Sequence, residues 1–115
     1  VTITAKDEFG NTCTNFNGSA TLSAVNSTVT EPTSITFVNG VWSGNVKLGT
    51  PGSDVQLKTI LTAPSVSSTS NKLSVAKGLH HFLISTIGNQ NKGVPFEITV
   101  TAKDEDNLTF TNFTG

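Results

Sequence analysis

Apolar and polar residues alternate along most of this chain, a period-two pattern that is typical of β-strands with one buried face. In the first run Val1, Ile3 and Ala5 share one face, and the residues between them are polar. Similar runs follow at short intervals, separated by turns rich in Gly, Asn and Pro, and no stretch shows a helical period. The pattern predicts strands over residues 1–7, 19–25, 34–38, 41–48, 54–61, 71–75, 79–87 and 94–102, with a Ser/Pro-rich loop over 63–70.

The clearest local signal is Asn39-Gly40, which lies between two of these runs. Asn-Gly favours a two-residue type I′ turn, because both positions of that turn need a positive φ. Such a turn fixes the register of a hairpin, and here it places Phe37 opposite Trp42 on one face. We expect that face to point into the core rather than to present Trp42 to a ligand.

Many short strands at even spacing indicate an all-β chain with the architecture of a β-sandwich, in which the inward side chains of two sheets form one core. The length of 115 residues is enough for one domain with a core of ordinary size. The side chains predicted to be buried are Ile3, Leu22, Phe37, Trp42, Val46, Leu57, Phe96, Ile98 and Val100.

The chain begins and ends with two copies of one 18-residue segment, which we call the phrase. Residues 1–18 read VTITAKDEFGNTCTNFNG and residues 98–115 read ITVTAKDEDNLTFTNFTG, with eleven of eighteen positions identical and no gap. The offset of 97 residues matches the roughly 100 residues of an immunoglobulin-like domain. The stretch Ala76-Lys77-Gly78 follows a completed run of strands and is therefore the expected joint between two modules.

This repeat predicts that the chain is a window shifted relative to the 97-residue module, so that it starts inside one module and ends inside the next. Residues 1–77 are expected to form an immunoglobulin-like module that lacks its opening strands. Residues 79–115 are expected to be the opening strands of the next module. Each part then exposes an apolar groove or an unpaired strand edge, and the opening strands of one copy can complete a neighbouring unit by strand addition.

The segments HHFLISTI, GVPFEITVTAKD, TNFTG, ITFVNGVWSGNVKL and NKLSVA resemble the tandem immunoglobulin-like repeat modules of prokaryotic cell-surface, S-layer and extracellular filament proteins. The resemblance covers essentially the whole chain in permuted order. It implies an immunoglobulin-like β-sandwich that serves as a spacer, a stalk or a lattice unit. It also implies an extracellular location, at the cell surface or secreted.

Composition narrows the function classes further. Only 13% of the residues are charged and the net charge is −1, so the chain offers no basic patch for nucleic acid. No apolar run approaches the length of a membrane span. The single cysteine, Cys13, has Phe110 as its counterpart in the second copy, which indicates an apolar position rather than sulfur chemistry.

Acidic residues gather in one loop of each copy and make Ca²⁺ the one candidate cofactor. The oxygen atoms come from Asp7, Glu8 and Asn11 in the first copy and from Asp104, Glu105 and Asp106 in the second. Calcium needs several oxygens that converge from a loop, and the two or three carboxylates of one loop are too few alone. The competing interpretation, which we favour, is an aspartate that caps its own turn through backbone N–H groups.

Two further kinds of candidate site occur. His80 and His81 could bind a metal or respond to pH, but no third His or Cys supports a site. Neighbouring residues of an extended segment also point to opposite sides, so we expect an exposed linker pair. Four N-x-[ST] sequons would suit a glycosylated surface protein, namely those at Asn17, Asn26, Asn107 and Asn112.

The sequence contains no Ser-His-Asp order, phosphate-binding loop or H-E-x-x-H element. The favoured hypothesis is therefore a non-enzymatic structural repeat unit of an extracellular filament, stalk or surface lattice. Its partners are copies of itself, joined head to tail by β-strand complementation. The alternatives are an adhesin or carbohydrate-binding module and an accessory domain of a secreted enzyme. A binding module needs exposed aromatics or a convergent polar pocket, whereas the Phe and Trp residues lie mostly on predicted core faces.

Overall fold

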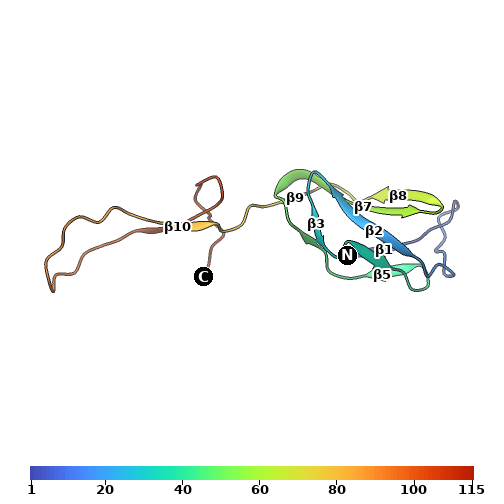
Figure 1. Cartoon of the computed structure of the whole chain (residues 1–115), viewed down its shortest axis with the longest axis horizontal. Coiled ribbons are helices and arrows are strands. Elements are labelled where there is room, and N and C mark those ends of the chain that lie inside the picture. Colours follow the sequence, from blue (N-terminus) through green and yellow to red (C-terminus); the bar gives the residue numbers. More distant parts are fainter. The chain divides into compact units, whose positions relative to one another are not determined.

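The structure, a computed structural model, describes residues 1–115 and consists of strands, turns and loops (Figure 1). It divides into two compact units, Val1–Ala76 and Lys77–Gly115. Every pair of strands is antiparallel, so the prediction of an all-β chain is confirmed. None of the chain forms a helix of the length and hydropathy needed to cross a membrane.

The first unit contains several antiparallel sheets. Its strands are β1 (Thr2–Thr4), β2 (Ser19–Val25), β3 (Val29–Glu31), β4 (Ser34–Thr36), β5 (Val41–Ser43), β6 (Lys47–Leu48), β7 (Gly52–Thr62), β8 (Ser65–Thr69) and β9 (Leu73–Val75). The largest sheet has the order β4-β2-β7-β8, and β9 pairs with the first part of β7. Two smaller sheets are formed by β1 with β5 and by β3 with β6.

The core of this unit is an apolar cluster to which β2, β4, β1 and β5 all contribute. The buried members are Ala20, Leu22, Ile35 and Phe37. They occupy alternate positions along β2 and along β4 with its extension, as the period-two pattern predicts. Among the residues predicted to be buried, Leu22 and Phe37 are confirmed. The remaining ones in this unit are only partly buried, namely Ile3, Trp42, Val46 and Leu57.

The turn at Asn39-Gly40 forms as predicted, with φ of 51° and 78°. The residues on either side of it exchange both backbone hydrogen bonds. Beyond that pair, however, β4 pairs with β2 and β5 pairs with β1, so the long hairpin predicted around the turn is wrong. The chain changes sheet at the turn because Phe37 and Trp42 can then both pack on one core from different sheets.

A strand occupies most of the stretch for which Ser and Pro content predicts a loop. β8 pairs with the second half of β7, from Thr69 opposite Lys58 to Ser65 opposite Thr62. Only Ala63 and Pro64 form the turn between the two strands. The loop prediction over residues 63–70 is therefore wrong, because pairing with a long neighbouring strand outweighs weak local preference.

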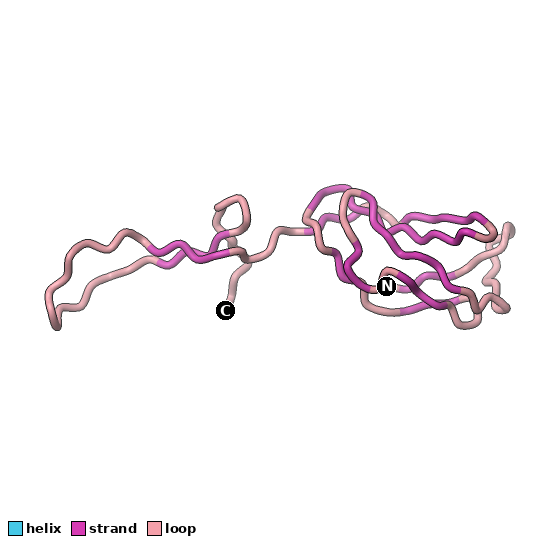
Figure 2. The backbone as a smooth tube through the Cα atoms, viewed as in Figure 1, coloured by secondary structure: helices cyan, strands magenta, loops and turns pink.

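The second unit is a two-stranded hairpin made of β10 (His81–Ile84) and β11 (Val100–Lys103). Most of residues 85–99 form a loop between the two strands (Figure 2). Phe96, Ile98 and Val100 are about half exposed, so the prediction that they are buried is wrong for this chain. The reason is that the hairpin has no second sheet within its unit to pack against.

Candidate functional site

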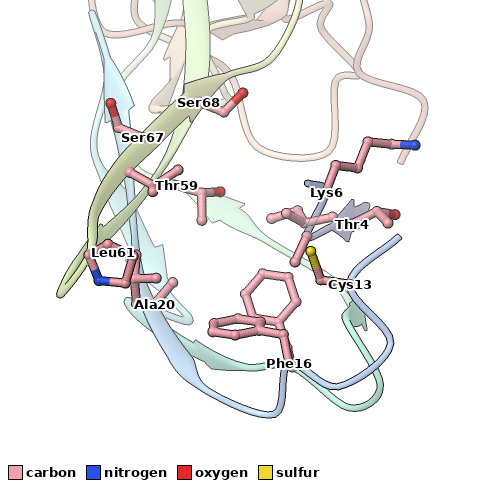
Figure 3. Close-up of a pocket in the computed structure, with 14 residues that line it drawn as sticks. Thr4, Lys6, Cys13, Phe16, Ala20, Thr59, Leu61, Ser67 and Ser68 are labelled. Carbon is pink, nitrogen blue, oxygen red and sulfur yellow. The ribbon is translucent and has the colours of Figure 1, made fainter. Parts of the chain in front are cut away.

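An apolar groove of about 440 Å³ opens in the first unit, with β1 on one side and β7 and β8 on the other. Residues 3–6 and Cys13 form one wall, and Leu61 and residues 66–68 belong to the other. Figure 3 shows these two walls facing each other across an open space, with Phe16 at the end where they meet. We call this feature the β1 groove.

A smaller hollow of about 250 Å³ extends the β1 groove toward the start of the chain. Residues 1–4 line it on one side, and Leu57, Thr59 and residues 68–70 line it on the other. Both hollows include residues from β1, β7 and β8. The β1 groove therefore runs along the full length of β1.

The edge of β1 that borders the groove has no partner strand. β1 pairs with β5 alone. On the side that faces β5, the Val1 carbonyl accepts the N–H of Gly44, and the N–H of Ala5 donates to the Gly40 carbonyl. Backbone groups alternate between the two sides of a strand. The N–H and C=O groups of Thr2, Thr4 and Lys6 therefore point away from β5, toward the free edge. An unpaired edge of this kind is a template for another extended segment.

The chemistry of the groove is that of a binding surface for apolar side chains. Phe16 lines it and contacts Phe37, with the ring centroids 5.2 Å apart. Val66 on the opposite wall is 56% exposed, so an apolar side chain of β8 stays in water. Burial of apolar surface together with backbone pairing is the interaction that such walls can supply.

The acidic loop of the first copy is closed by its own hydrogen bonds. One carboxylate oxygen of Asp7, Oδ1, accepts the N–H of Phe9 at 2.9 Å and the N–H of Asn11 at 2.8 Å. The side-chain amide of Asn11 donates to the other oxygen at 3.2 Å. The backbone N–H of Asn11 is the main cause that holds the pKa of Asp7 below its ordinary value. Asp7 thus caps its turn, which is the interpretation favoured from the sequence.

The acidic loop of the second copy has the same arrangement. Oδ1 of Asp104 accepts the N–H of Asp106 at 3.0 Å and the N–H of Leu108 at 2.9 Å. The Asp106 carboxylate pairs with Lys77, and this contact raises the pKa of the Lys77 amine. The carboxylates of Asp7, Asp104 and Asp106 are therefore engaged by the protein itself.

The structure places the predicted calcium ligands in two separate loops, one in each unit. Glu8 and Glu105 are exposed. No group of three or more His, Cys, Asp or Glu side chains converges anywhere in the chain. Calcium binding at these loops stays a prediction from the sequence.

The two histidines contact each other. The Nδ1 atoms of His80 and His81 are 3.1 Å apart, and the rings meet edge to face with centroids 5.3 Å apart. Nε2 of His81 lies 3.2 Å from the Oδ1 atom of Asn107. The expectation that the rings point to opposite sides is wrong, because His80 precedes β10 and is outside the alternation of that strand.

The remaining sequence candidates lie as follows. Cys13 carries a free thiol, is partly buried and lines the β1 groove. The side-chain oxygen of Asn17 accepts the N–H of Asn39 at 2.9 Å, so this sequon residue also holds the turn of the first unit. All four sequon asparagines are exposed: Asn17, Asn26, Asn107 and Asn112.

The wall that β8 contributes to the groove is not predicted by the sequence pattern. The Ser and Pro content of residues 63–70 predicts a loop, whereas Pro64, Val66 and Ser68 line the groove. The signal that could have found this wall is the run SVSST, which places β-branched residues among serines.

Comparisons with known proteins give no relative for this chain. No family model, no curated protein and no solved structure matches it.

Proposed function

We propose that this chain is a non-enzymatic structural repeat unit of an extracellular filament, stalk or surface lattice, built on an immunoglobulin-like β-sandwich. Copies join head to tail by β-strand complementation. The observation that carries the proposal is that each unit has what the other lacks. The first unit has an apolar groove beside an unpaired strand edge. The second unit has strands with no sheet to cover them.

Exposed apolar side chains on the second unit support this assignment. Those between 40% and 56% exposed include Leu79, Phe82, Leu83, Ile84, Ile87, Val94, Phe96, Ile98 and Val100. Clusters of this kind are typical of surfaces that bind a partner. Full burial of one such side chain contributes about 1.5–3 kcal/mol. Because the groove and the hairpin are different surfaces, their contact is heterologous, and repeated contacts of this kind can extend into a fibre.

The extracellular location rests on two observations. Segments of the chain such as GVPFEITVTAKD and ITFVNGVWSGNVKL resemble those of repeat modules in prokaryotic surface proteins. All four asparagines of the N-x-[ST] sequons are exposed. The binding chemistry in this proposal is strand pairing and apolar burial, so assembly needs no metal ion. A chelator should therefore leave assembly unchanged.

Sedimentation velocity of the full chain over a range of concentrations, with negative-stain electron microscopy, tests the proposal. We expect oligomers that grow with concentration and appear as linear, unbranched particles. A chain that remains a monomer up to high micromolar concentration contradicts the proposal. Closed dimers that do not grow also contradict it, because head-to-tail contacts have no reason to stop at two copies.

A further inference from the structure

We propose that residues 79–87 of a second copy of this chain occupy the β1 groove, paired antiparallel with β1 in the register that β10 has with β11. This inference rests on the proposed head-to-tail assembly and specifies its contact. In the exchange, β1 of one copy takes the place of β11 of the other.

The repeat supplies the template for this pairing. The offset of 97 residues places Thr99, Thr101 and Lys103 of the second copy on Thr2, Thr4 and Lys6 of the first, with identical residue types. In the second unit these three residues lie opposite the strand that precedes them. His81 is paired with Lys103 and Leu83 with Thr101, and the N–H of Ser85 donates to the C=O of Thr99 at 2.8 Å.

The edge that β10 uses on β11 is the edge that is free on β1. In β11 the hydrogen bonds to β10 involve the residues that match Thr2, Thr4 and Lys6. In the first copy the backbone groups of Thr2 and Thr4 in β1, and of Lys6 just beyond it, point away from β5 and border the groove. A strand in the position of β10 would therefore complete β1 without disturbing its pairing with β5.

The register also decides which side chains enter the groove. Phe82 lies opposite Ala102, which matches Ala5, and Ile84 lies opposite Val100, which matches Ile3. Both Ile3 and Ala5 line the β1 groove. Side chains of directly opposed residues lie on the same face of a sheet. Phe82 and Ile84 of the second copy therefore point into the groove, and His81 and Leu83 point out of it.

An aromatic contact in the second unit identifies the place of Phe82. Its ring meets that of Phe113 edge to face, with centroids 5.5 Å apart. Phe113 matches Phe16, which lines the β1 groove (Figure 3). Phe16 in turn contacts Phe37 of the core. The same pairing on β1 therefore adds Phe82 to a row of aromatic rings that begins in the core.

The exchange gains burial, and β10 keeps a backbone partner while β11 loses one. Phe82 and Ile84 are 51% and 55% exposed in the hairpin. An isolated two-stranded hairpin is marginally stable in water, so its opening costs little. On β1 the same strand finds the same sequence of backbone partners together with a groove for its two apolar side chains.

The occupant is placed in another copy because the inference rests on the proposed head-to-tail assembly. Insertion of residues 79–87 into the groove of the same chain would leave a monomer, which sedimentation velocity distinguishes from assembly.

Matched variants of the full chain test the inference by sedimentation velocity. Phe82→Asp places a charge in the groove and should reduce the association constant at least a hundredfold. Leu83→Asp places the same charge on the outer face and should change it less than threefold. Thr4→Pro removes the N–H group that Thr4 presents at the free edge of β1 and should also abolish assembly. Proline is tolerated at an unpaired strand edge, so this variant should still fold.

Mixing the two inactive variants excludes misfolding as the cause. Phe82→Asp retains the groove, and Thr4→Pro retains the inserting strand. Together they should form a one-to-one dimer and nothing larger, whereas each alone remains a monomer. The inference is overturned if the mixture stays monomeric, or if Leu83→Asp is as harmful as Phe82→Asp. Assembly that persists in Phe82→Asp overturns the inference and leaves the proposed function standing.

Oxidative cross-linking tests the register. On a Cys13→Ser background, Ile3→Cys combined with Ile84→Cys brings two thiols to opposed positions without hydrogen bonds, where Cα atoms about 4.5 Å apart suit a disulfide. We expect a ladder of covalent oligomers on a non-reducing gel. The control, Ala5→Cys with Ile84→Cys, is displaced by two residues and should give none. A ladder from the control alone, or from neither pair, contradicts the proposed register.

Discussion

Residues 1–18 and 98–115 are two copies of one phrase in two different surroundings. Their loops are the same: an aspartate, Asp7 or Asp104, accepts two backbone N–H groups from the loop that follows it. The bridge between Lys6 and Thr12 in the first copy has its counterpart between Lys103 and Thr109. The loop thus forms whether or not a sandwich surrounds it, because its hydrogen bonds are local.

One loop position shows how little the sequence of this phrase must be conserved between the two copies. Gly10 has φ of 87°, and its counterpart Asn107 has φ of 63°. Glycine adopts positive φ freely, and asparagine is the residue that tolerates it best among the others. The two copies therefore satisfy the same backbone requirement with different residues.

The two copies differ in what covers them. In the first, the turn at Asn39-Gly40 docks on the phrase: Ala5 donates to the Gly40 carbonyl, and Gly40 donates to the Phe16 carbonyl, both at 2.8 Å. Phe16 then packs against the core. In the second copy Phe113 is 41% exposed. Local sequence determines the loop, whereas burial of the apolar face depends on strands that are distant along the chain.

The largest expected effect is that of Gly40→Ala, which disrupts the docking of the Asn39-Gly40 turn on the first copy. A Cβ atom at this position would lie 2.4 Å from the carbonyl oxygen of Cys13, and the backbone has positive φ. We expect a loss of about 3 kcal/mol in the free energy of unfolding of the first unit. Urea unfolding followed by the fluorescence of Trp42, the sole tryptophan, measures it.

Gly10→Ala is the matched control for that substitution. Gly10 also has positive φ, but a Cβ atom there meets nothing within 4 Å. Its cost should be about 1 kcal/mol, and Gly10→Asn, which copies the second phrase, should cost less than Gly10→Ala. If Gly10→Ala is as harmful as Gly40→Ala, then contact with the turn does not distinguish the two copies.

The next largest effect distinguishes Phe16 in the first copy from its counterpart Phe113 in the second. Phe16→Ala should lower the free energy of unfolding of the first unit by about 2–3 kcal/mol, since the ring packs on Phe37 but remains partly exposed. Phe113→Ala should leave the transition reported by Trp42 unchanged. Both are measured at a protein concentration at which the chain is a monomer. Equal effects would mean that the second copy also supports the core of the first unit.

The smallest effect concerns the charge of Asp7. The folded loop holds the pKa of this carboxyl below its ordinary value of 3.8. As pH falls, the unfolded chain takes up the proton first, so the stabilisation present above pH 3.8 is lost as pH falls through the folded pKa. Asp7→Asn removes this dependence. Thermal unfolding between pH 6 and pH 2 should show the midpoints of the wild type and of Asp7→Asn converge at low pH.

Asp104→Asn is the control for the pH experiment. Its side chain belongs to the loop of the second unit and should not alter the unfolding of the first as reported by Trp42. A pH dependence that Asp104→Asn reduces as strongly as Asp7→Asn would contradict the assignment to Asp7.

Much of the first unit could be predicted from the pattern of its residues. Leu22 and Phe37 are buried as their alternation indicates, and Asn39-Gly40 forms its turn. β8 and the separation of β4 from β5 could not be predicted in this way. Strand pairing between residues far apart in sequence decides them, and alternation does not reveal which strand is the partner.

Only the position of one wall of the β1 groove could be predicted from the sequence. Alternation predicts a strand over residues 1–7, and the groove lies beside the unpaired edge of β1. The residues of its far wall, Val66 and Ser68 among them, could not be named, because they belong to β8. Which face of residues 79–87 fits the groove follows only from the register of β10 on β11.

The sequence by itself determined the β character of the chain, the turn at Asn39-Gly40 and the shared loop of the two phrases. These features depend on the backbone preferences of single residues and on hydrogen bonds a few residues apart. Only the tertiary structure decided which apolar faces are buried. Phe96, Ile98 and Val100 alternate as regularly as the core residues do, yet they are half exposed. Alternation marks a face that can be buried, and burial requires a second sheet to cover it.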